Sequence, residues 1–326
     1  MSNKRVYLDY AATTPVAPEV VEAMLPYFHE TFGNPSSIHR FGLEAKAALD
    51  QARSTLARAL NATPHEIYFT SGGTESNNLA ILGRAMQFKQ PGHIITSAIE
   101  HPSVLQPCKH LQQHGWRVTF LPVDRWGRVD PADLEKAITE DTALISIMYV
   151  NNEIGTINPI AKLAEIAAAR RIPFHTDAAQ AFGKVKIDVR ATPISLLSIA
   201  GHKIYAPKGV GVLYIKRGVT LSRLLFGGGQ ENELRPGTEN LPGIVGLAKA
   251  VELMERQFEA EVQRLEHLAQ RFMQRISREI PAAILNGHPQ QRLPWVLNYS
   301  FPGMDNTSLV MALDLEGVAI SNGSAC

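Results

Sequence analysis

Short apolar runs alternate with amphipathic helical patterns between about residues 60 and 215, and this alternation constrains the fold more than any other feature. The runs are rich in Ile, Val, Phe and Tyr and are bounded by Gly, Pro, Asp or Asn. We expect strands at Ile67–Thr70, His93–Ala98, Arg117–Val123, Ala143–Val150, Pro173–Ala178, Leu196–Ala200 and Gly209–Ile215, with helices that include Glu75–Gln87, Ser103–His114 and Ile160–Arg171. Such alternation predicts an α/β fold whose seven-stranded, mostly parallel sheet is covered by helices on both faces.

Two departures from simple alternation refine this prediction. The last two apolar runs are separated only by Gly201–Lys208, which is too short for a crossover helix, so the sheet is expected to be mixed there. After Gly227-Gly228-Gly229 the pattern changes to one long helix and then short strands around another helix. These elements are expected at Glu239–Ile280, Trp295–Phe301, Asn306–Leu315 and Gly317–Ile320. We therefore predict a large domain at 15–250 and a smaller α+β domain formed by 1–14 and 251–326.

Charge and composition exclude several classes of protein. With 32 Lys plus Arg against 31 Asp plus Glu, the net charge of +1 gives no support for a nucleic-acid or membrane-surface partner. No apolar run approaches the roughly 20 residues that span a bilayer, and Met1–Arg5 leads into Val6 without the apolar core of a signal peptide. The two cysteines, Cys108 and Cys326, have no metal-type spacing, which favours a reduced, cytoplasmic setting without a metal centre.

Three strand ends carry residues suited to chemistry. The first, Thr70-Ser71-Gly72-Gly73-Thr74, is a strand, a glycine turn and a helix start, where backbone amides and the Thr74 hydroxyl can hold a phosphate. An ordinary strand-to-helix turn capped by Thr74 or Ser71 explains this motif equally well. The second is Asp177, whose carboxylate at the end of an apolar strand needs a partner such as a protonated pyridine nitrogen, or else serves as a helix N-cap.

The third strand end carries Lys203, within Ser198-Ile199-Ala200-Gly201-His202-Lys203. A lysine in such a turn is usually a solvated cation. A desolvated lysine near a cationic ring instead has a lowered pKa and can form a Schiff base. Each of the three motifs is weak evidence alone. Together they support one site, because all three lie at strand ends and ligands of open α/β sheets bind at the carboxyl ends of the strands.

The order of phosphate loop, aspartate and lysine resembles the fold-type I pyridoxal phosphate enzymes, and specifically the cysteine desulfurases of the class V aminotransferase family that serve iron–sulfur cluster assembly. The resemblance runs from Tyr7-Leu8-Asp9-Tyr10-Ala11-Ala12 to the last residue. It also includes Gly33–Ser37, Glu100-His101-Pro102, Val150–Gly155, Arg235–Asn240 and Ser321-Asn322-Gly323-Ser324-Ala325-Cys326.

The resemblance implies a role for each matching residue. Lys203 forms the Schiff base with pyridoxal 5'-phosphate and shuttles the substrate proton. Asp177 pairs with the pyridine nitrogen, Gln180 with the ring hydroxyl, and His101 stacks on the ring and assists proton transfer. The remaining cofactor contacts are expected from Gly73, Thr74, His202 and Asn152, with Thr238 arriving from the second subunit of a homodimer.

Cys326 is the expected nucleophile. By resemblance, its thiolate takes the sulfur of L-cysteine as a persulfide, leaving L-alanine, and passes the sulfur to an acceptor protein for iron–sulfur cluster assembly or tRNA thiolation. Gly323, Ser324 and Ala325 suit a flexible loop around such a nucleophile, whereas Cys108 is expected to pack inside a helix. A close alternative is selenocysteine lyase, a transaminase of this fold would not need Cys326, and a catalytically idle scaffold for sulfur acceptors is a further alternative.

The chain departs from the family pattern at two places. Many relatives have a phosphate-binding serine where this chain has Ala200, which predicts one fewer phosphate contact. Relatives also continue for several dozen residues after the corresponding cysteine, through an arginine that binds the substrate carboxylate. The resemblance therefore predicts that this sequence is cut after the nucleophile at Cys326.

Overall fold

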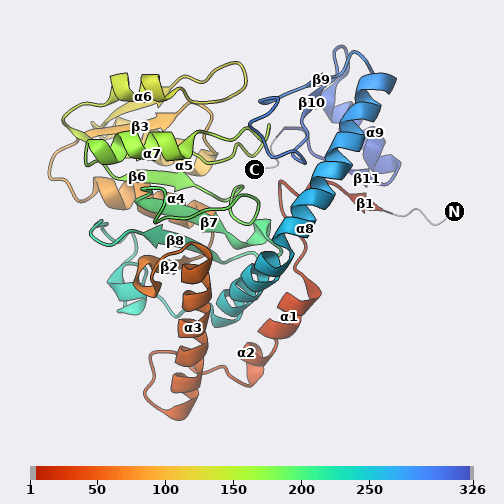
Figure 1. The fold of residues 1–326 in the computed structure, drawn as a ribbon. Coiled ribbons are helices and arrows are strands. Elements are labelled where there is room, and N and C mark those ends of the chain that lie inside the picture. The colour runs from red at the N-terminus through yellow and green to blue at the C-terminus, as the bar shows by residue number, and fades with distance from the viewer. Residues whose placement is uncertain (1–4, 324–326) are drawn as a thin grey trace.

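The computed structural model describes residues 5–323, and within them seven strands form one mixed sheet (Figure 1). The strand order is β2-β8-β7-β6-β5-β3-β4. Strand β8 is antiparallel to both of its neighbours and the remaining pairs are parallel. The strands are β2 (Ile67–Thr70), β3 (His93–Ser97), β4 (Arg117–Leu121), β5 (Thr142–Ser146), β6 (Phe174–Asp177), β7 (Leu196–Ala200) and β8 (Gly211–Ile215).

Alternate residues of the strands face two separate hydrophobic cores. Ile94 and Leu144 join one core with helices α4 (Gly73–Ala85) and α5 (Pro102–Gln113). Their neighbours Ile95 and Ile145 join the other core with α3 (Arg40–Ala59), α7 (Ile160–Ala169) and the first half of α8 (Leu241–Glu279). Because successive side chains of a strand point to opposite faces, a strand that is apolar throughout needs helices on both sides.

Helix α8 connects the large sheet to a smaller structure (Figure 1). Its first part packs on α1 (Pro18–Met24) and α3, and its second part runs to the two-stranded sheets of the smaller structure. There β1 (Val6–Tyr7) pairs in parallel with β11 (Val318–Ala319), and β9 (Ile284–Leu285) pairs antiparallel with β10 (Tyr299–Ser300). The other elements are α2 (Pro26–His29), α6 (Pro131–Ala137), α9 (Asn306–Leu315) and the 3-10 helices η1 (Pro64–Glu66), η2 (Gly201–Lys203) and η3 (Gln230–Glu233).

The predicted fold class is confirmed, including the antiparallel step between β7 and β8. The expected strand at Trp295–Phe301 is wrong over its first half, because Val296 donates back to Leu293 in a turn and only Tyr299–Ser300 joins a ladder. The domain limits remain a prediction, and α8 runs unbroken through the boundary expected at residue 250. No helix within residues 5–323 combines the length and apolar character needed to cross a membrane.

Candidate functional site

The carboxyl edge of the sheet gathers the predicted site residues. Asp177 is the last residue of β6, and Lys203 ends the η2 turn that follows β7. The glycine loop after β2 opens α4, and His101 stands four residues beyond β3 at the start of α5. Because these strands run in the same direction, their ends meet at one edge, where ligands of open α/β sheets bind.

Lys203 is buried, with its side chain under the N-terminal segment of the chain. Its Nζ donates a hydrogen bond to the carbonyl of Ala12 at 2.8 Å and another to the carbonyl of Ala11. Gln180 Nε2 donates to the same Ala11 carbonyl at 2.7 Å. The two predicted cofactor ligands therefore share one acceptor and lie side by side beneath Ala11 and Ala12.

A second lysine, Lys184, fixes the orientation of the Gln180 amide. Lys184 Nζ donates to Gln180 Oε1 at 2.7 Å, and this bond directs the amide nitrogen of Gln180 toward Ala11. Burial, and secondarily the charge of Lys203, lowers the pKa of Lys184 to about 7. Burial, with a smaller contribution from Lys203, therefore favours the neutral amine of Lys184.

Asp177 is buried and held by two donors. The backbone amide of Ala179 donates to its Oδ1 at 2.9 Å, and Asn77 Nδ2 on α4 donates to its Oδ2 at 2.7 Å. The carboxylate therefore has two donors within the protein, and its pairing with a pyridine nitrogen stays a prediction. The bond to Ala179, two residues on, also shows that Asp177 stabilises the turn after β6.

His101 stands at the N-cap of α5, where its Nδ1 accepts a hydrogen bond from the backbone amide of Ser103 at 3.1 Å. Burial lowers its pKa, Asp177 opposes that change, and the charge of Lys203 adds to it. His101 therefore serves the helix as a cap and also lies within electrostatic reach of Asp177 and Lys203. His101 therefore has a structural role as a helix cap, and that role does not exclude a second role at the site.

The glycine loop brings the N-terminus of α4 against the ends of β6 and β7. Gly72 is the N-cap and no side chain caps the helix, so the alternative in which Thr74 or Ser71 caps it is wrong. The φ of Gly72 is +153°, a conformation that a side chain would strain. A Cβ added to Gly73 would lie 3.3 Å from the Cβ of Ala200. The backbone amides at the start of α4 thereby stand at the same edge as Lys203, with Thr74 exposed on the first turn.

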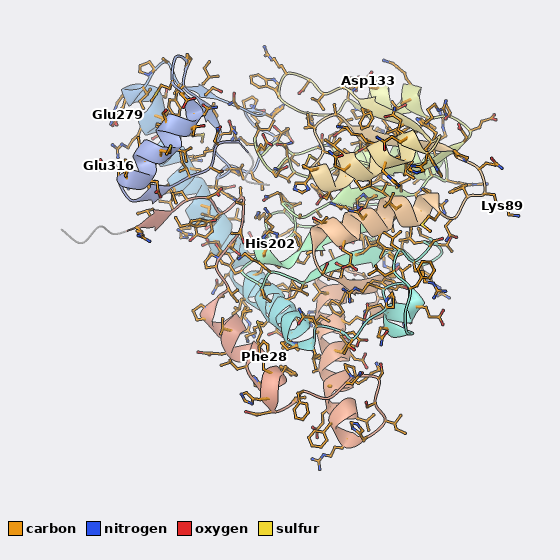
Figure 2. The ribbon with its side chains drawn as sticks, turned by 180° about the vertical axis from the view of Figure 1, so that it is seen from behind. Phe28, Lys89, Asp133, His202, Glu279 and Glu316 are labelled. Carbon is orange, nitrogen blue, oxygen red and sulfur yellow. The ribbon has the colours of Figure 1, made fainter. Side chains whose placement is uncertain are left out.

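His202 lies near the centre of the molecule, whereas Lys89 and Glu316 lie at its edges (Figure 2). Its Nδ1 is 3.2 Å from Thr13 Oγ1, and its carbonyl accepts from both the amide and the hydroxyl of Thr14. Burial, followed by the charges of Lys203, Lys208 and Lys184, lowers its pKa to about 4. The charges of these three lysines make the potential at His202 positive, which favours an anion there.

The remaining predicted residues are placed less closely. Asn152 lies on the turn after β5, where Asn151 Oδ1 accepts from the amides of Glu153 and Ile154. Thr238 is exposed in the loop before α8. Cys326 lies outside the described residues. Cys108 is buried in α5 as expected, and burial raises the pKa of its thiol to about 12.

Sequence reasoning assigned no role to several groups that surround the site. The contacts from Ala11 and Ala12 come from backbone carbonyls, which every residue has. The sequence motif around them therefore gave no sign of this role. Ser103 stands two residues after His101, a spacing that could have drawn attention to it, whereas nothing in the sequence separates Asn77 from its neighbour Asn78. Glu100, the buried neighbour of His101, also had no predicted role, and burial raises the pKa of its carboxyl group.

Glu100 holds a proton at neutral pH. Burial raises its pKa to about 8, although Ser97 Oγ and the amide of Met148 donate to Oε1 at 2.6 and 2.8 Å. Its Oε2 has no hydrogen-bond partner among residues 5–323. In the unfolded chain a glutamate releases its proton near pH 4.3. The folded protein therefore binds one more proton than the unfolded chain between about pH 4.3 and 8, and stability falls as pH rises through this window.

Glu100→Gln is expected to remove this loss of stability, because the amide keeps the Oε1 acceptor and carries no charge. The unfolding free energy of the variant relative to the wild type should rise between pH 5 and 8, by an amount on the order of a few kcal/mol. Denaturant unfolding at matched cofactor content measures it. The exposed Glu135→Gln is the matched control and should give a flat difference. Parallel pH profiles for the two variants would contradict a buried proton on Glu100.

Comparison with known proteins agrees with this geometry. The family model described as Aminotransferase class-V matches residues 6–326, nearly the whole chain. The chain belongs to this family. Within this class-V family, its curated relatives include the cysteine desulfurase IscS of Dictyoglomus turgidum, 52% identical over 99% of this chain and 82% of the relative.

Solved structures of class-V relatives share the fold. A NifS-like protein superposes with a TM-score of 0.94 at 38% identity, covering 98% of this chain and 87% of the other. A structure titled SspA in complex with cysteine gives a TM-score of 0.87 at 42% identity, over 98% of this chain and 90% of that one. The resemblance stated from the sequence is confirmed, and the chain groups with the cysteine desulfurases of the class-V family.

Proposed function

We propose that this protein is a pyridoxal phosphate-dependent cysteine desulfurase. The observation that carries the proposal is the buried Lys203 at the carboxyl edge of the sheet, within electrostatic reach of His101 and next to Gln180. Relatives named cysteine desulfurase, about half identical over almost the whole chain, make this the activity to test first.

The residues at this edge fit pyridoxal phosphate. The N-terminus of the 13-residue α4, with Gly73 packed close to Ala200, offers backbone amides for the phosphate, and Thr74 and His202 would add side-chain contacts to it. Asp177 is a buried carboxylate suited to the pyridine nitrogen. The amide nitrogen of Gln180, which donates to the carbonyl of Ala11, would bind the ring oxygen in its place, and Thr238 of a second subunit would complete the phosphate contacts. Ala200 offers no hydroxyl, so one phosphate contact is absent from this set.

The chain's own residues would carry the proton chemistry. Pyridoxal phosphate, when bound, supplies an electron sink for charge that develops on the substrate Cα. Lys203 would hold the cofactor, take the Cα proton of L-cysteine and return a proton during the reaction. The Ala11 and Ala12 carbonyls, which accept from Lys203 Nζ, direct the amine before a ligand arrives. His101 would face the ring as a neutral imidazole that can exchange a proton, and Asn152 would lie near the substrate carboxylate.

Cys326 would receive the sulfur. Its thiolate forms a bond to the substrate sulfur while the Cβ–S bond of cysteine breaks, which leaves L-alanine and a persulfide on Cys326. A proton delivered to the former Cβ completes the balance. The sulfur then passes to an acceptor protein for iron–sulfur cluster assembly or tRNA thiolation. This step requires a thiolate that is accessible, unlike the buried Cys108.

A homodimer is part of the same proposal. Five large apolar side chains around α2 and the start of α3 are more than half exposed: Phe28, Phe32, Ile38, Phe41 and Leu43. The ring centroids of Phe32 and Phe41 lie 5.8 Å apart, so at least these two side chains are neighbours on this surface. Contiguous exposed apolar surface of this kind marks an interface, and a second copy of this chain is the expected partner.

The test is release of alanine from L-cysteine by the purified chain loaded with pyridoxal phosphate, with light scattering on the same sample to measure the dimer. Stoichiometric alanine and persulfide would support a desulfurase. Faster alanine release from selenocysteine, with little from cysteine, would indicate a selenocysteine lyase. Bound cofactor with no alanine from either substrate, together with capture of an acceptor protein, would instead indicate a scaffold and overturn the proposal.

A further inference from the structure

A chain of buried polar side chains connects Asp177 to His101. Asn77 Nδ2 lies 2.7 Å from Asp177 Oδ2 and 2.8 Å from Ser103 Oγ, and Ser103 Oγ lies 2.7 Å from His101 Nδ1. Asn77, Ser103 and Asp177 are each less than one-tenth exposed. These hydrogen bonds join three elements: the end of β6, the second turn of α4 and the first turn of α5.

The direction of the bonds made by Asn77 is fixed by Asp177. An ionised carboxylate only accepts hydrogen bonds, so the atom of Asn77 that faces Asp177 is the amide nitrogen. The same nitrogen donates to Ser103, and the other amide atom, Oδ1, is buried with no hydrogen-bond partner among residues 5–323. An unpartnered buried oxygen is costly. Asn77 tolerates this cost in an orientation that serves two acceptors at once.

The proton on His101 follows from the same logic. Ser103 accepts from Asn77, which leaves its hydroxyl proton available for His101 Nδ1. The backbone amide of Ser103 also donates to Nδ1, at 3.1 Å. A nitrogen that faces two donors carries no proton, so the neutral imidazole has its proton on Nε2. The lowered pKa of His101, caused first by burial, agrees with a neutral ring.

We propose that Asn77 and Ser103 are positioning residues that set the His101 proton on Nε2 and hold Asp177 in one orientation. This inference rests on the proposed function, because it makes the two residues on either side of the expected cofactor parts of one hydrogen-bonded unit. Asn77 and Ser103 touch neither substrate nor cofactor in this scheme, and they act through His101 and Asp177. Their hydrogen bonds leave Nε2 as the only donor of the imidazole.

The test combines ¹⁵N spectra of labelled histidine in the full chain with pyridoxal phosphate binding. A His101→Asn spectrum assigns the signal. In the wild type we expect a neutral ring protonated on Nε2. In Asn77→Leu, which has nearly the same shape and no donor, Ser103 can accept from Nδ1, so the Nδ1-protonated share should rise about threefold or more. The dissociation constant for pyridoxal phosphate should rise about tenfold, since Asp177 loses a charge-assisted bond.

Asn78→Leu is the matched control, because Asn78 follows on the same helix but donates to the carbonyl of Thr74, which is not part of the hydrogen-bonded series from Asp177 to His101. It should change both quantities less than twofold. Ser103→Ala decides the matter if Asn77→Leu does not fold: it should shift the histidine proton in the same direction, and Ser103→Thr should restore it. A histidine signal unchanged in Asn77→Leu and Ser103→Ala would overturn the proposal, even if cofactor binding weakened. Failure of the proposed function is distinct, because a wild type that binds no pyridoxal phosphate would still report where the His101 proton lies.

Discussion

Replacing Lys203 by alanine is expected to lower alanine release from L-cysteine by about 10³-fold or more. Lys203 is the buried amine at the carboxyl edge, and its Nζ is already directed by the carbonyls of Ala11 and Ala12. Alanine at this position removes both the covalent attachment of the cofactor and the group that takes the Cα proton. The measurement is single-turnover alanine release, followed together with the visible absorbance of the lysine-bound cofactor, which should disappear.

Lys208→Ala is the matched control for this experiment. Lys208 lies five residues later in the same connection between β7 and β8, is exposed, and adds to the positive field on His202. Its loss should leave the absorbance of the lysine-bound cofactor in place and change the rate by less than tenfold. If Lys203→Ala retained the absorbance band while Lys208→Ala lost it, the assignment of the attachment site would be wrong.

The fold could be predicted because its strands carry neighbouring apolar residues that face both sides of the sheet. Ile94 and Ile95, or Leu196 and Leu197, pack into opposite cores, and only a sheet with helices on both faces accommodates such pairs. The antiparallel step at β8 followed from the short Gly201–Lys208 connection. The first half of Trp295–Phe301 failed because apolar composition resembles a strand, whereas the hydrogen bond from Val296 to Leu293 makes a turn. That bond depends on local geometry that composition does not encode.

The site could be predicted only where side chains carry its chemistry. Asp177, Lys203 and His101 are polar residues at strand ends, and the edge of the sheet brings them together by topology. The cover over Lys203 consists of the carbonyls of Ala11 and Ala12, which every residue type possesses. Asn77 could not be distinguished from Asn78 in the sequence. The helix turns one of them into the core toward Asp177 and leaves the other bonded to Thr74.

Cys326→Ser is expected to abolish persulfide formation and alanine release while the absorbance of the lysine-bound cofactor stays unchanged. The described chain that leads to Cys326 runs beside the cover of the site: β11 pairs with β1, and Ser321 Oγ donates to Asp9 Oδ1 at 2.8 Å. Two residues after Asp9 stands Ala11, whose carbonyl accepts from Lys203 and Gln180. The described part of this segment, up to Gly323, is therefore tied to the N-terminal segment whose Ala11 carbonyl accepts from Lys203. Mass spectrometry of the protein after reaction with L-cysteine measures the added sulfur.

Cys108→Ala is the matched control, because Cys108 is the other cysteine of the chain and its buried thiol, with its pKa raised to about 12, supplies almost no thiolate at neutral pH. This variant should form persulfide and alanine at near wild-type rates, with a modest loss of stability from the small cavity. Alanine release that survived in Cys326→Ser would mean that sulfur leaves the substrate without this nucleophile. A persulfide lost in Cys108→Ala but kept in Cys326→Ser would move the nucleophile to α5 and contradict the assignment.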